Sequence, residues 1–60
     1  SMANMSYVRF ENTLPDLRDC KEHFFDDDLS ESEQKARRRM VKVIREIVEG
    51  LKDNDQWEEE

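Results

Sequence analysis

Five apolar residues recur at the spacing of an α-helix, and they constrain the fold more than any other feature of this sequence. Ala36, Met40, Ile44, Ile47 and Leu51 follow one another at steps of four, four, three and four residues. These steps keep the five side chains on one side of a helix. The sequence therefore predicts a long amphipathic helix with an apolar stripe that needs a covering surface.

Residues 30–51 also carry the start and stop signals of such a helix. Ser30 and Glu33 fit a capping box, in which each side chain accepts a hydrogen bond from the other residue's backbone amide. Gly50 disfavours a helix interior by about 1 kcal/mol and predicts either the C-terminus or a fraying last turn. We therefore expect the long helix to begin after Ser30 and to end near Leu51.

A shorter helix is expected upstream, over residues 14 to about 26. Thr13 is a good N-cap and Pro15 suits a first turn. Three adjacent carboxylates at residues 26–28 oppose the helix dipole and should end this helix. Before it, residues 6–12 alternate between apolar and polar side chains, which is typical of a short strand. An irregular extended arm explains the same pattern equally well.

The length of the chain limits how much apolar surface it can hide by itself. A domain of 60 residues buries only about 60% of the surface that its unfolded chain exposes. Cys20 is the only cysteine, which excludes an internal disulfide. The sequence therefore predicts an all-α helical hairpin over residues 6–52, including the short N-terminal arm or strand, that dimerises into a four-helix bundle. The expected dimer interface consists of Met40, Ile44, Ile47 and Leu51.

The two ends of the chain are expected to lie outside this hairpin. Residues 1–5 carry no pattern and are interpreted as an added or disordered tail. Residues 53–60 are polar except for Trp57 and are interpreted as an acidic flexible tail, unless Trp57 folds back onto the helices.

The net charge of −6 hides a segregation of charge along the chain. Residues 30–45 hold six basic and two acidic side chains, whereas the rest of the chain holds four basic and fourteen acidic ones. The basic segment could bind nucleic-acid phosphate or an acidic partner surface, or it could pair with the aspartates of the first helix or simply stay solvated. The acidic surface could dock on a basic groove. The candidate partner-binding residues are therefore Arg37, Arg38, Lys42, Asp26, Asp27 and Asp28, and either surface could bind.

Catalysis and cofactor binding have no motif to support them. The chain lacks a nucleophile–base–orienter set and a glycine-rich phosphate loop, so no catalytic or cofactor-binding residue is assigned. Cys20 and His23 lie three residues apart, but a zinc site needs three or four ligands. The acidic triplet at residues 26–28 lacks the spacing and the glycine of an EF-hand loop. We therefore expect neither a metal site nor enzymatic activity.

The order of elements, a short strand followed by two helices, resembles that of the ribbon-helix-helix repressors. Phe10 and Pro15 match the usual layout of that family. The resemblance implies a dimer whose paired strands read the major groove of DNA. The outward residues of the strand, Tyr7, Arg9 and Glu11, would then contact the bases.

A second resemblance covers residues 5 to about 51. The segments SYVRFENT, DLRDC and LSESE, which begin at Ser6, Asp16 and Leu29, are similar to segments of small proteins encoded by tailed bacteriophages. Some small acidic proteins of this kind inhibit host defence systems. The resemblance implies an anti-CRISPR-like inhibitor, or an inhibitor of another host or anti-phage defence protein, in the bacterial cytoplasm.

Two hypotheses follow from these observations. The first is a non-enzymatic homodimer that binds a host protein; its acidic flanks would repel nucleic acid. No run of apolar residues exceeds three, so neither a membrane-spanning helix nor a membrane partner is expected, and the cytoplasm is the expected location. The alternative hypothesis is a ribbon-helix-helix DNA-binding transcriptional regulator.

Overall fold

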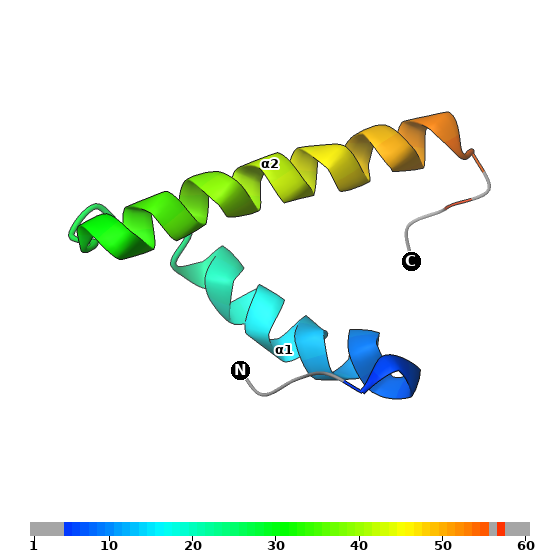
Figure 1. The fold of residues 1–60 in the computed structure, drawn as a ribbon, viewed down its shortest axis with the longest axis horizontal. Coiled ribbons are helices and arrows are strands. Elements are labelled where there is room, and N and C mark those ends of the chain that lie inside the picture. Colours follow the sequence, from blue (N-terminus) through cyan, green and yellow to red (C-terminus); the bar gives the residue numbers. More distant parts are fainter. Residues whose placement is uncertain (1–4, 56, 58–60) are drawn as a thin grey trace.

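Two α-helices joined by a loop make up the part of the chain that the structure describes. The computed structural model describes residues 5–55 and residue 57. A 3₁₀ turn, η1 (Ser6–Val8), leads into α1 (Arg9–Glu22), and α2 (Glu31–Asp53) follows after the loop (Figure 1). No β-strand occurs among these residues. The predicted all-α helical hairpin is therefore confirmed for the described part of the chain.

The predicted tails fall largely outside the described residues. Residues 1–4, 56 and 58–60 are not among them. The Trp57 amide donates a hydrogen bond to the Asn54 carbonyl at 3.3 Å, and Trp57 is 67% exposed. The indole therefore keeps most of its surface in solvent rather than folding back onto the helices.

The long helix begins where its capping signal predicts. Ser30 has an extended backbone, and its hydroxyl accepts a hydrogen bond from the Glu33 amide at 3.2 Å. The Gln34 side chain adds a second bond across this start by donating to the Leu29 carbonyl at 3.0 Å. At the other end, the Asn54 amide donates to the Gly50 carbonyl at 3.0 Å. Gly50 therefore lies in the last turn of α2, and the helix does not stop there.

The short helix begins earlier than the sequence predicts, and this overturns the extended arm or strand expected over residues 6–12. The Val8 amide donates to the Met5 carbonyl at 3.0 Å and closes η1. α1 then starts at Arg9, so Thr13 and Pro15 lie inside it. A lone strand leaves its backbone groups unpaired, whereas a helix pairs them within the segment. Pairing these backbone groups stabilises the helix by more than it loses at Pro15, which has no amide hydrogen and so cannot donate one intrahelical hydrogen bond.

The short helix also ends earlier than predicted, at Glu22 rather than near Asp26. Beyond Glu22 the chain continues as a tighter turn: the Phe24 amide donates to the Lys21 carbonyl at 3.3 Å, and the Asp26 amide donates to the His23 carbonyl at 3.2 Å. The adjacent carboxylates oppose the negative end of the helix dipole, which disfavours further helical turns.

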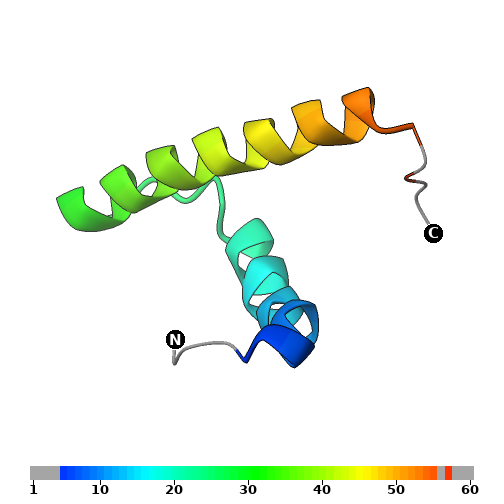
Figure 2. The ribbon, with the colours of Figure 1, turned by 45° about the vertical axis from the view of Figure 1, so that its right-hand side comes forward.

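The two helices meet only near the loop and then diverge (Figures 1 and 2). No side chain among the described residues is fully buried. Most of the partly covered ones lie where α1 approaches the first half of α2; they include Cys20, Phe24, Leu29, Arg37, Met40 and Ile44. The hairpin is thus an open V, and its apolar faces are not closed into a core.

Candidate protein-binding surface

A shallow crevice lies where the end of α1 meets the start of α2. Apolar and charged side chains of both helices and of the loop line it: Asp19, Cys20, His23, Phe24, Asp26, Leu29, Glu33, Ala36, Arg37 and Met40. Ala36 and Met40 belong to the predicted stripe; Met40 is partly covered here, whereas Ala36 stays exposed. The crevice is therefore a place where the hairpin partly shields its own apolar surface.

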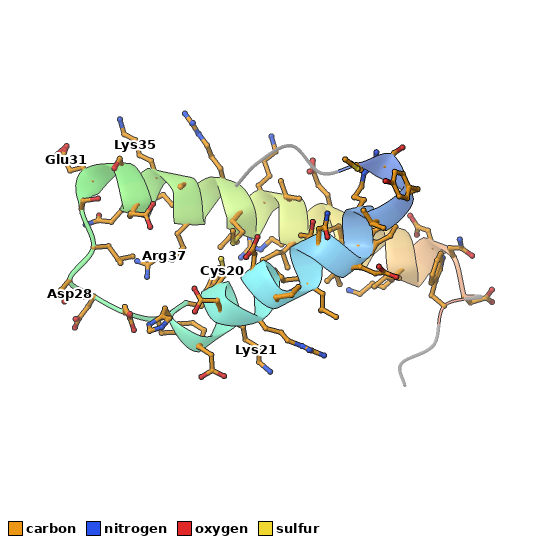
Figure 3. All side chains as sticks on the ribbon, turned by 90° about the horizontal axis from the view of Figure 1, so that it is seen from below. Cys20, Lys21, Asp28, Glu31, Lys35 and Arg37 are labelled. Atoms are coloured by element: carbon orange, nitrogen blue, oxygen red, sulfur yellow. The ribbon has the colours of Figure 1, made fainter. Side chains whose placement is uncertain are left out.

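Arg37 links α2 to the loop that follows α1. Its Nη1 donates hydrogen bonds to the carbonyl oxygens of Phe24, at 2.9 Å, and Asp26, at 2.7 Å. Figure 3 shows Arg37 reaching from α2 toward the loop. These carbonyls follow the end of α1, where a helix leaves acceptors without intrahelical donors. Arg37 therefore bonds to its own chain and links α2 to the loop. It does so through backbone carbonyls, whereas the sequence suggested pairing with aspartate side chains.

The other two basic candidates lie on a different side of α2. Arg38 and Lys42 are exposed and line a shallow depression away from the crevice, together with Arg45 and the carboxylates of Glu46, Glu49 and Asp53. Exposed cations attract acidic partner groups, and each exposed ion pair adds about 0–1 kcal/mol. Arg38 and Lys42 are thus available to an acidic partner.

The acidic candidates lie on the loop. Asp26, Asp27 and Asp28 are exposed, and the Asp26 Oδ2 lies 3.0 Å from the Nδ1 of His23. His23 Nε2 also lies 4.0 Å from Asp19 Oδ1. No group of three or more histidine, cysteine, aspartate or glutamate side chains in the described residues is arranged to hold a metal ion.

These carboxylates raise the pKa of His23 above its ordinary value of 6.5, first through the hydrogen bond to Asp26 and then through the charges of Asp26 and Asp19. A raised pKa means that the pair stabilises the fold below pH 6.5 and loses this contribution as the pH rises through the folded-state pKa. An NMR titration of the His23 ring protons should therefore show a midpoint above 6.5.

Asp26→Asn should return this midpoint toward 6.5, because it removes the largest cause of the shift. Asp27→Asn, which changes the neighbouring exposed carboxylate, is the matched control and should leave the midpoint where it was. Equal midpoints in the two variants would contradict the assignment to Asp26.

Much of the apolar surface lies beyond the reach of the crevice. On α2, Ile47 is 57% exposed and Leu51 is 44% exposed, whereas Met40 and Ile44 are partly covered. The predicted dimer interface is thus divided: its first two residues are partly shielded within the chain, and its last two are free.

The short helix contributes an exposed apolar face that the sequence analysis placed partly on an arm. Phe10 is 83% exposed, Leu14 45% and Leu17 46%. Their steps of four and three residues place them on one side of α1. This spacing was the signal that could have extended the helix back to Arg9. We call the exposed apolar side of α2 that contains Ile47 and Leu51 the open apolar face.

Comparison of the chain with protein families, with curated proteins and with solved structures gives no match. In the described residues, neither helix combines the length and the apolar character that crossing a membrane requires. What the chain binds must therefore be inferred from the surfaces of its two helices.

Proposed function

We propose that this chain is a small non-enzymatic protein-binding module that acts as a homodimer. The observation that supports this most is the open apolar face: a folded hairpin leaves Ile47 and Leu51 about half exposed and buries no side chain among its described residues. Fully burying side chains of this size stabilises a structure by about 1.5–3 kcal/mol each. A partner surface is the source of burial that the single chain lacks.

The first partner in this proposal is a second copy. Two hairpins pair through α2, with Met40, Ile44, Ile47 and Leu51 at the interface, and their four helices share one apolar core. The partly covered residues Met40 and Ile44 would connect this core to the crevice under α1.

The second partner in this proposal is a bacterial host protein or an anti-phage defence protein in the cytoplasm. Its support is the resemblance to small phage proteins together with two exposed charged surfaces. One surface is basic and contains Arg38 and Lys42; the other is acidic and contains Asp27 and Asp28. The acidic surface can dock on a basic groove and so compete with nucleic acid for the target.

Two measurements test the two parts of this proposal. Sedimentation at micromolar concentration should give a dimer, and a single-chain mass would contradict the homodimer. A pull-down from bacterial lysate should then compare the wild type with Arg38→Glu/Lys42→Glu and with Asp27→Lys/Asp28→Lys. Loss of one captured protein in only one of these variants identifies the binding surface. Capture that neither variant changes would contradict binding through either surface.

No feature of the described residues supports the alternative of a ribbon-helix-helix regulator. Tyr7 lies in η1, and Arg9 and Glu11 lie in α1, so these residues do not form the strand that would enter a DNA groove. Filter binding to duplex DNA at low salt separates the two hypotheses, because a DNA-binding dimer would show strongly salt-dependent retention.

A further inference from the structure

We infer that the two copies of α2 pair in antiparallel orientation, centred near Glu46 and Ile47. The inference rests on the proposed homodimer and specifies the partner's orientation and register. It depends on two independent features: the part of the stripe that α1 leaves uncovered, and the distribution of charge along α2.

The uncovered part of the stripe sets the centre of the pairing. α1 covers the first part of α2, where Ala36 and Met40 line the crevice. The exposed apolar residues of α2 lie further along, from Val43 to Leu51. A two-fold axis near residue 47 places Val43 of each copy beside Leu51 of the other and so covers this exposed part of the stripe in both copies.

The distribution of charge along α2 sets the direction of the pairing. Residues 30–45 hold six basic and two acidic side chains, whereas residues 46–55 hold four acidic and one basic. Antiparallel pairing brings each basic segment near the partner's acidic segment, and parallel pairing brings like segments together. Charge complementarity of this kind fixes orientation more than it adds affinity.

Distances between spin labels at single sites distinguish the orientations. Two full-length proteins carry one new cysteine each, Lys35→Cys or Glu46→Cys, in a Cys20→Ala background. Both sites are exposed on α2. In the antiparallel dimer, the two copies of residue 35 lie about 35 Å apart along the helix axis at 1.5 Å rise per residue. The two copies of residue 46 lie at nearly the same level along the axis and so within about 20 Å, which is the roughly 10 Å between packed helix axes plus about 5 Å of helix radius on each side.

A long distance at residue 35 with a short one at residue 46 is the expected result. Short distances at both sites would overturn the orientation while leaving the dimer intact. Long distances at both sites would overturn the pairing of α2 near residue 47. No dipolar coupling at either site, with a single-chain mass in sedimentation and a helical circular dichroism spectrum, would overturn the homodimer and this inference with it.

Discussion

Replacing Ile47 with Asp should leave the hairpin helical and abolish its dimer. Ile47 is 57% exposed and lies outside the crevice, so the folded single chain gains little from it. In the proposed dimer, the exposed 57% of both copies of Ile47 becomes buried, which is worth about 1.7–3.4 kcal/mol together, because full burial of one such side chain is worth about 1.5–3 kcal/mol. Losing this burial raises the dissociation constant roughly 20–300-fold, and the cost of burying two carboxylates raises it further. Sedimentation across a concentration series measures the shift.

Lys42→Gln is the matched control for this variant. It makes the same change in net charge, and Lys42 lines the depression on the other side of α2. We expect this control to dimerise nearly as well as the wild type. Circular dichroism should show similar helix content in both variants. An Ile47→Asp protein that remains a dimer would contradict an interface through the stripe.

Ile47 separates association from folding better than Ile44, although both belong to the predicted stripe. Ile44 is partly covered in the single chain. A charge at Ile44 could therefore disturb the hairpin as well as the dimer. Helical periodicity places both residues on one face, but it cannot tell which of them the short helix covers, because this depends on the angle between the helices.

The long helix was predictable because its signals are local. The Ser30 cap and the repeating apolar residues act within one segment, and the structure places the helix start where they predict it. The start of the short helix was not predictable in the same way. Alternation over residues 6–12 fits a strand, but the spacing of Phe10, Leu14 and Leu17 also fits a helix. A strand needs a second strand, and the described chain supplies none.

In the candidate site, too, the sequence predicts what depends on one helix and misses what depends on how the two helices meet. Exposure of Arg38 and Lys42 follows from their positions away from the stripe, and the structure has both exposed. The different behaviour of Arg37 depends on where the chain turns after α1. Sequence reasoning grouped the three basic residues because it could not place the carbonyls of Phe24 and Asp26 beside α2.

Replacing Arg37 with Met should weaken the junction between the helices. Both hydrogen bonds from its Nη1 would be lost, at 2.9 Å to Phe24 and 2.7 Å to Asp26. Methionine keeps a long side chain and a high helix propensity, so the loss is confined to the charge and the bonds. Hydrogen bonds to charged groups contribute about 1.5–3 kcal/mol each. Since water can reach these partly exposed carbonyls, we expect the free energy of unfolding to fall by an amount in that range for the two bonds together.

A loss of this size matters because a 60-residue domain has a total stability of only roughly 3–9 kcal/mol at 0.05–0.15 kcal/mol per residue. Urea unfolding in the Ile47→Asp background measures it without a contribution from dimerisation. Arg38→Met, at the exposed neighbouring residue, should stay within about 0.5 kcal/mol of its parent. Hydrogen exchange should become faster at the amides of residues 23–29 in the Arg37 variant alone. Equal losses in both variants would show that charge, and not the bonds to the loop, holds the two helices together.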